Sequence, residues 1–317
     1  MTKWRRATGV AVTVSGALCL SACAGDSGAS GGGTAPASRA AGSPSAAPVS
    51  MEQYGATLKS AVDPLETELA DLAKAKAYKG LQGRVGDVKA AVTQAAAKLR
   101  PVAPPAEVVQ EHTGLVSALG RFESVVGGLG GEVGSRNLCT GAAVRAKIGD
   151  ADGTGALRSA MAAVQAKVPG GRRTLKLPAA GQKPGSRPSN GALIRSGGGG
   201  NGRLTVDNSG GSDDALVTLS KGGKPKMSVY VRHGKKHTVN GVPDGTYTVF
   251  FTGGTAWDGA AKAFGRECAF QKFEDPLKYT TTTTATHIRY STWRITLQEV
   301  VGGNARTSDV NPDDFPE

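Results

Sequence analysis

The cysteines have the most specific chemistry in this chain, because a thiol can be acylated, joined in a disulfide or used to bind a metal. Four occur, at Cys19, Cys23, Cys139 and Cys268. A basic segment over 1–6 and an uncharged, mostly apolar segment over 7–20 precede Cys23. As a helix, the second segment would rise only about 21 Å, short of the roughly 30 Å hydrocarbon core of a bilayer. The pattern therefore predicts a secretory signal segment and not a membrane span.

The residues before each of these two cysteines differ in size. Cys19 follows Leu18, which is too bulky for a signal-peptidase site, whereas Cys23 follows two small residues. The stretch before Cys23 resembles the lipobox of bacterial lipoproteins, with the four residues Leu20, Ser21, Ala22 and Cys23. The resemblance implies removal of 1–22 as a signal peptide and a thioether-linked diacylglycerol with fatty-acyl chains on Cys23. The alternative is an ordinary signal peptide cut after Ala22, leaving a free cysteine.

The lipobox resemblance also implies a location and a first partner. Two acyl chains give stable anchoring, so we expect an exported protein held at the outer face of the cytoplasmic membrane. Residues 23–50 then form the lipid anchor and a tether rich in Ala, Gly, Ser and Pro. Such a segment behaves as a flexible coil that spans about 29 Å on average.

The two remaining cysteines are 129 residues apart, Cys139 in the stretch RNLCTG and Cys268 in RECAF. An exported protein meets an oxidising environment, and an even pair of cysteines there predicts a disulfide. Two separate thiols and an intermolecular bridge are the alternatives.

Residues 51–168 show the apolar spacing of amphipathic helices, for example in the series Tyr54, Leu58, Val62, Leu65, Leu69 and Leu72. Spacings of three and four residues place such a series on one helix face. The intervening loops are short, which predicts an antiparallel helical bundle. Asp63-Pro64 predicts that the first helix restarts or kinks there.

Residues 169–202 are rich in Gly and Pro, with six cations and no acid. This composition predicts an extended, solvated linker. Its charge could strap the protein onto anionic wall polymers or headgroups, or it could only keep a spacer soluble. The whole chain has 317 residues and a net charge of +12, falling to +9 without the signal segment. This basic excess favours anionic partners, although a basic surface without a dedicated partner explains it equally well.

From residue 203 to 300 the apolar period changes to two, with turns at short intervals, which predicts an antiparallel β-sandwich or barrel. The stretch VNGVPDGTYTVFF over 239–251 loosely resembles PEGA-like and prealbumin-like modules. The phase of apolar residues changes near Ser291-Thr292, which predicts a bulge or turn there. Residues 301–317 form a polar, irregular tail. The expected fold class is thus α+β with two domains.

No constellation of residues points to catalysis, a cofactor or a metal. His112 lies on an apolar helix stripe, which favours a core histidine. His233 and His237 flank a basic hairpin tip with no acid nearby in sequence, and this argues against a metal pair. The stretch DADGTG over 150–155 lacks the glutamate of a calcium loop, because Met161 stands in its place. The run of threonines over 280–284 is best explained as an exposed strand. An aromatic content of 5% argues against a stacking platform for carbohydrate or single strands, so no specific nucleic-acid partner is expected.

The sequence therefore predicts a non-catalytic binding or scaffolding module in the cell envelope, of unidentified ligand and protein partner. A solute receptor for a transporter is the first alternative, although such receptors usually have two α/β lobes, and here the helices come before the strands. An envelope hydrolase is the second, and it would need a nucleophile that the sequence does not indicate.

Overall fold

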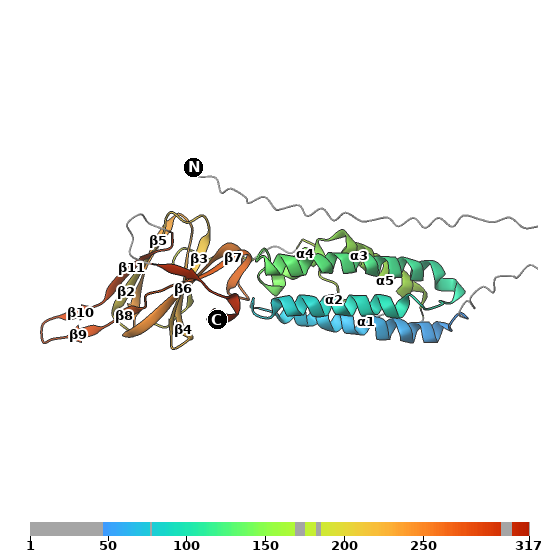
Figure 1. Cartoon of the computed structure of the whole chain (residues 1–317), viewed down its shortest axis with the longest axis horizontal. Helices are drawn as coiled ribbons and strands as arrows, with labels where there is room; N and C mark the ends of the chain where they lie inside the picture. Colours follow the sequence, from blue (N-terminus) through green and yellow to red (C-terminus); the bar gives the residue numbers. More distant parts are fainter. Residues whose placement is uncertain (1–46, 77, 169–174, 182–184, 299–305, 317) are drawn as a thin grey trace, which may run out of the picture. The chain divides into compact units, whose positions relative to one another are not determined.

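The computed structural model describes residues 47–76, 78–168, 175–181, 185–298 and 306–316 (Figure 1). Cys23 and the residues of the lipobox lie outside the described residues. The protein is mixed α+β, with helices first and strands after them. The helices are α1 (Met51–Lys74), α2 (Leu81–Leu99), the 3₁₀ turn η1 (Ala106–Val108), α3 (Val109–Gly134), α4 (Gly141–Gly149) and α5 (Asp152–Lys167).

The helices pack through their apolar stripes onto one shared core. Helix α1 packs against α2, α2 against α3, and α3 against α5, and Leu65, Leu99, Leu119 and Leu157 are fully buried among them. Ser50 begins α1 with a capping box, in which its hydroxyl accepts from the Gln53 N–H and the Gln53 side chain accepts from the Ser50 N–H.

Helix α1 runs unbroken through Pro64, so of the two predicted outcomes, a restart or a kink, the restart does not occur. A proline inside a helix leaves the carbonyl four residues earlier without its N–H donor. Here Lys98 of α2 donates from Nζ to that carbonyl, on Ser60, at 3.0 Å. Tertiary contact thus replaces the missing backbone hydrogen bond.

The remaining described chain forms strands. They are β1 (Leu193–Arg195), β2 (Gly202–Asn208), β3 (Asp214–Lys221), β4 (Lys224–Val231), β5 (Lys235–Val242), β6 (Gly245–Asp258), β7 (Ala263–Phe273), β8 (Leu277–Tyr279), β9 (Thr281–Thr283), β10 (Ile288–Tyr290), β11 (Thr292–Thr296) and β12 (Thr307–Asp309), followed by the 3₁₀ turn η2 (Pro312–Asp314). The largest sheet has the order β1-β4-β3-β6-β7-β12, with β8 beside β6, and a second sheet has the order β11-β2-β5. Pairing between the described strands is antiparallel except for β11 and β2, which are parallel.

The largest sheet buries both of its faces around β3, in which seven consecutive residues are buried. Val217 and Leu219 belong to a core shared with Val206 of β2 and Val239 of β5. Leu216 lies on the opposite face, in a second cluster with Tyr230, Trp257, Phe264 and Phe270. This second face carries the site described below.

The predicted break near Ser291-Thr292 is confirmed, because β10 ends at Tyr290 on β9 and β11 begins at Thr292 on β2. The threonines of β9 are at most half-buried, as expected for an exposed strand. Strands β9 and β10 form a hairpin that projects from the other strands (Figure 1).

The described residues of 169–202 do not form the predicted extended linker. Leu175 is buried in the helical core, and β1 (Leu193–Arg195) pairs with β4. Between them, Arg187 binds the buried Asp214 through both carboxylate oxygens. The composition predicted a solvated segment because it has cations and no acid of its own. The fold supplies an acid from elsewhere in the chain, Asp214 of β3.

The described end of the chain is also more ordered than predicted. Strand β12 pairs with β7, and Phe315 packs edge-on against Phe250 and Phe270. The apolar residues Val310 and Phe315, which the polar surroundings obscured, hold this segment on the sheet.

Candidate binding site at the disulfide-linked junction

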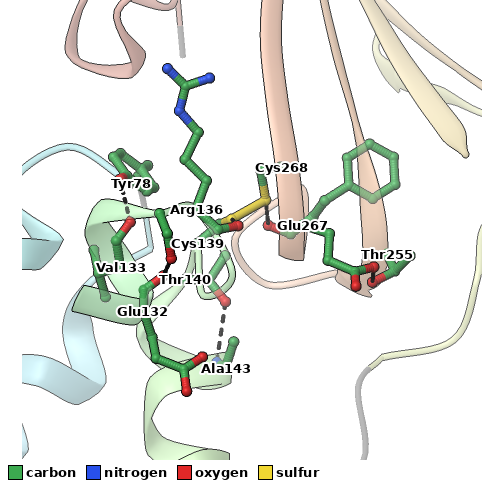
Figure 2. The surroundings of a disulfide bond; sticks show 12 residues. Tyr78, Glu132, Val133, Arg136, Cys139, Thr140, Ala143, Thr255, Glu267 and Cys268 are labelled. Carbon is green, nitrogen blue, oxygen red and sulfur yellow. Dashed lines mark hydrogen bonds between the residues drawn. A yellow bond between two sulfur atoms is a disulfide. The ribbon is translucent and has the colours of Figure 1, made fainter. Parts of the chain in front are cut away.

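A disulfide joins Cys139, in the turn after α3, to Cys268 in β7, with Cα atoms 6.5 Å apart (Figure 2). It therefore links the helices to the largest sheet, as predicted. In the chain-entropy model a loop of this length stabilises the folded state by about 5 kcal/mol. Both cysteines are buried.

Backbone hydrogen bonds reinforce the disulfide on either side. The Cys139 N–H donates to the Gly265 carbonyl at 2.8 Å, and the Cys268 N–H donates to the Arg136 carbonyl at 3.1 Å. Arg136 and Glu267 adopt left-handed φ values of 63° and 54°, a conformation that costs a non-glycine residue about 1–3 kcal/mol. The disulfide and the two flanking hydrogen bonds, which together form the junction between the helices and the sheet, offset that cost.

Aromatic side chains fill the space beside the disulfide. Tyr78, from the loop after α1, packs its ring 5.7 Å from that of Phe270 and donates its hydroxyl to the Val133 carbonyl (Figure 2). The guanidinium of Arg136 lies 5.9 Å from the Phe270 ring centre, within cation–π range. Phe315 contacts the other side of Phe270. The helices, the sheet and the end of the described chain therefore meet at one aromatic cluster.

A cavity of about 160 Å³ lies at this cluster. Its apolar wall includes Tyr78, the two cysteines, Ile194, Leu216, Phe264, Phe270 and Phe315. Three hydroxyl residues also line it, namely Thr218, Ser228 and Thr252, and so do three cationic residues, Lys76, Arg195 and Lys262. Aspartate and glutamate are absent from the residues that line it in the described chain.

Some polar side chains of this cavity have hydrogen-bond partners within the described chain, and others do not. The hydroxyls of Thr218 and Ser228 hydrogen-bond to each other at 2.9 Å. Within the described chain the Thr252 hydroxyl has no hydrogen-bond partner, and the side chains of Lys76, Arg195 and Lys262 have neither ion pair nor hydrogen bond. These three cations are exposed, so they form a positive rim around an apolar interior.

An ion cluster beside this cavity fixes its β1 wall. Asp214 is buried and accepts hydrogen bonds from Arg187, from the Tyr230 hydroxyl and, at 2.9 Å, from the His233 N–H. Burial alone would raise the pKa of Asp214, but these hydrogen bonds outweigh it and hold the pKa below its usual range. Burial and the same carboxylate raise the pKa of Tyr230. The cluster thereby holds the chain before β1 against the sheet.

The histidines considered in the sequence lie apart from this cavity. His112 is buried and hydrogen-bonds through Nδ1 to the Tyr54 hydroxyl at 3.1 Å, which confirms a core histidine. Burial lowers the pKa of His112; burial, with the charge of Glu111, raises the pKa of Tyr54 to about 12.

One histidine of the basic turn, His233, has an acid near it in space, although none is near it in sequence. His233 Nδ1 lies 3.3 Å from Asp214. His237 lies on β5 opposite Val206, and the adjacent Lys236 pairs with Asp207 at 2.9 Å. The described residues contain no group of three His, Cys, Asp or Glu side chains placed to share a metal.

Sequence reasoning identified the two cysteines of this site but missed the cavity and the Asp214 cluster. The residues of the cavity come from the loop between α1 and α2, the turn after α3, β1, β3, β4, β6, β7 with the loop before it, and the end of the described chain. These segments are far apart in sequence. One available signal was the aromatic pair in RECAF and DDFPE, since Phe270 and Phe315 stand out in a chain with few aromatics.

Comparison with protein-family models, with curated proteins and with solved structures finds no match for this chain in any of the three. Among the described residues, no helix combines the length and the apolar character that crossing a membrane requires.

Proposed function

We propose that this chain is a cell-envelope lipoprotein whose folded part is a non-catalytic binding module, with the junction cavity as its ligand site. The observation that carries the binding role is the cavity of about 160 Å³, apolar inside and rimmed by three cations without counter-ions among the described residues. Pockets of this kind, apolar with a few convergent polar groups, are typical ligand sites where two structural parts meet. The Leu20-Ser21-Ala22-Cys23 sequence supports the anchor, with an acylated Cys23 at the outer face of the cytoplasmic membrane.

We further propose that the helices form an antiparallel bundle and the strands a β-sandwich, with the disulfide fixing one against the other. The shared helical core supports the bundle. The core between Val217 and Leu219 of one sheet and Val206 and Val239 of another supports the sandwich. Two rigid parts held by the Cys139–Cys268 bond would keep the cavity preformed, which lowers the entropic cost of binding.

Solute capture for a transporter is the second candidate, and the cavity favours it over a purely scaffolding role because its size suits a small molecule. The order of helices before strands differs from the two α/β lobes usual in such receptors. Uptake of the bound solute by cells that lack this chain distinguishes solute capture from other binding roles. Reduced uptake supports capture, and unchanged uptake supports a binding module of another kind.

The anchor is tested by the intact mass of the N-terminal peptide from membrane-purified protein. We expect a peptide that begins at Cys23 and carries the added mass of a diacylglycerol and its acyl chains. Cys23→Ala should abolish that mass, whereas the matched variant Cys19→Ala should keep it, because Cys19 is discarded with the signal segment. Unmodified Cys23 in the wild type would refute the anchor.

The non-catalytic role is tested by incubating the purified chain with panels of esters and glycans. We expect no turnover above a heat-treated sample. Turnover that a single substitution abolishes would refute this part of the proposal.

A further inference from the structure

We propose that the junction cavity binds a small monocarboxylate with a compact aromatic or branched apolar body. This inference rests on the proposed binding function and names the class of ligand for its site. Three properties of the cavity lead to it: its volume, the character of its wall and the charge at its rim.

The volume limits the apolar part of the ligand. The cavity measures about 160 Å³, and an engineered apolar cavity of about 150 Å³ binds benzene. One six-membered ring or a branched chain of similar size therefore fills it. A long acyl chain or an oligosaccharide exceeds this space and would extend out of the cavity, whereas a small molecule with a compact apolar body fills it.

The wall requires an apolar body. Leu216, Phe264 and Phe270 are buried side chains that face this space, and a bare inorganic anion placed against them would lose its hydration without compensation. Burying an aromatic or branched body on the same surface is favourable in proportion to the apolar area removed from water. Phosphate or sulfate alone is consequently a poor fit.

The rim sets the charge of the ligand. Lys76, Arg195 and Lys262 come from three separate parts of the chain and line the same cavity. Each is exposed, and none has an ion pair with another described residue. A carboxylate at the mouth would receive charge-assisted hydrogen bonds, which are stronger than neutral ones. Positive charge without acids in the lining also disfavours cationic ligands.

The Thr252 hydroxyl supplies a polar contact further in. Thr252 is buried, lines the cavity and has no hydrogen-bond partner within the described chain. The Thr252 oxygen itself keeps some solvent access, so the hydroxyl is open to the cavity and can donate to a ligand. An oxygen of the ligand would satisfy this hydroxyl, so the carboxylate or a hydroxy group beside it is placed within the cavity and not only at its mouth.

The experiment uses the purified full chain and follows ¹⁹F NMR of 4-fluorobenzoate during titration. We expect a dissociation constant of about 1 mM or tighter, a reasonable value for a ligand of this few atoms. The neutral isostere 4-fluorobenzamide should bind at least tenfold more weakly, and inorganic phosphate at equal concentration should not displace the benzoate. Equal affinity for the neutral and charged probes, or displacement by phosphate, would overturn the assignment.

The triple variant Lys76→Gln, Arg195→Gln and Lys262→Gln tests whether the rim is responsible. Exposed charge pairs are individually weak, so we expect the three substitutions together to lower the affinity by about tenfold. The matched control Lys89→Gln, Arg121→Gln and Lys278→Gln removes the same net charge from exposed residues outside the cavity. Equal losses in both triples would show a nonspecific charge effect and overturn the proposal.

Thr252→Val gives a second test that preserves shape and net charge. We expect it to weaken 4-fluorobenzoate binding several-fold, because a methyl group replaces the hydroxyl, and to leave 4-fluorobenzamide equally or less affected. An unchanged affinity would remove the Thr252 contact and with it the deep placement of the ligand oxygen.

The outcomes separate this inference from the proposed function. If the neutral probe binds and the carboxylate does not, the ligand class is wrong while the binding module stands. If neither probe binds, both the ligand class and the cavity as a site fail. The mass of the N-terminal peptide is independent of either result and tests the anchor alone.

Discussion

The helices and the strands of this protein are stabilised in different ways. The described helical core is almost wholly apolar. Its buried polar residues, such as His112 and Thr154, do not include an aspartate or a glutamate. The strands instead bury two carboxylates, Asp207 and Asp214, each bound by cations from other elements. The helices thus meet through apolar side chains at a regular spacing, whereas the strands also join distant parts of the chain through buried carboxylates and their cations.

Asp207 illustrates this at the pair β2 and β11, which is parallel where the other described strand pairs are antiparallel. It lies on β2 and accepts from Arg294 of β11 at 2.7 Å and from Lys236 of β5 at 2.9 Å. Burial would raise the pKa of Asp207, but hydrogen bonds from Ser209 and these two cations lower it overall. One carboxylate thus ties three neighbouring strands together.

The disulfide should give the largest effect, because it couples the two regions. The double variant Cys139→Ser and Cys268→Ser should lower the free energy of unfolding by about 5 kcal/mol in the entropy model. We expect denaturant unfolding to split into two transitions, one for each region. The reduced wild type is the control and should behave in the same way; a single, unshifted transition would contradict a coupling role.

The substitution Asp214→Asn should have the second-largest effect. We expect it to lower the free energy of unfolding by about 3 kcal/mol, because it leaves Arg187 without its buried carboxylate partner. The folded state holds the pKa of Asp214 below its ordinary value of 3.8. The contribution is therefore present above that pH and lost as the pH falls below it, so the difference between variant and wild type should shrink in acid. Asp213→Asn, at the exposed neighbouring residue, is the control and should have little effect at any pH.

His112 should make the stability of the helical region depend on pH, at higher pH values than those at which Asp214 acts. Burial lowers the pKa of His112 below the ordinary value of 6.5. As the pH falls, the unfolded chain therefore binds a proton at this residue before the folded chain does, and the stability decreases below about pH 6.5. We expect the unfolding midpoint to decrease between pH 7 and pH 5 in the wild type. His112→Phe should flatten this dependence and His287→Gln should not; an unchanged slope in the first variant would contradict the assignment.

The helix cap should give the smallest effect. Ser50→Ala removes the capping box of α1, and we expect a loss of about 1 kcal/mol in the free energy of unfolding. Ser117→Ala, at an exposed position inside α3, is the matched control and should be neutral or slightly stabilising. A loss at Ser50 no larger than that at Ser117 would show that the cap contributes nothing.

Much of the fold could be predicted because its signals are local. The series from Tyr54 to Leu72 repeats with the helical period, and it is buried along one helix face. The phase change at Ser291 likewise marks the point where the chain moves from β9 to β2 as its pairing strand. The sequence could not show that α1 continues through Pro64, because the hydrogen bond that replaces the missing one comes from Lys98, on a different helix.

The candidate site was predictable only in its cysteines. The sequence favoured pairing Cys139 with Cys268 but left two alternatives open, and the structure brings the two sulfurs together. The cavity beside them could not be foreseen, since its cations are separated by more than a hundred residues in places and have no shared motif.

The sequence by itself determined the α+β class, the order of helices before strands and the region of each, because side-chain periodicity reports directly on local backbone geometry. Only the tertiary structure decided that Arg187 meets Asp214, that β1 joins the sheet, and that three cations face one apolar cavity. The physical reason is that a charge or a hydroxyl acquires its partner through chain folding, and composition near it in sequence carries no information about that partner.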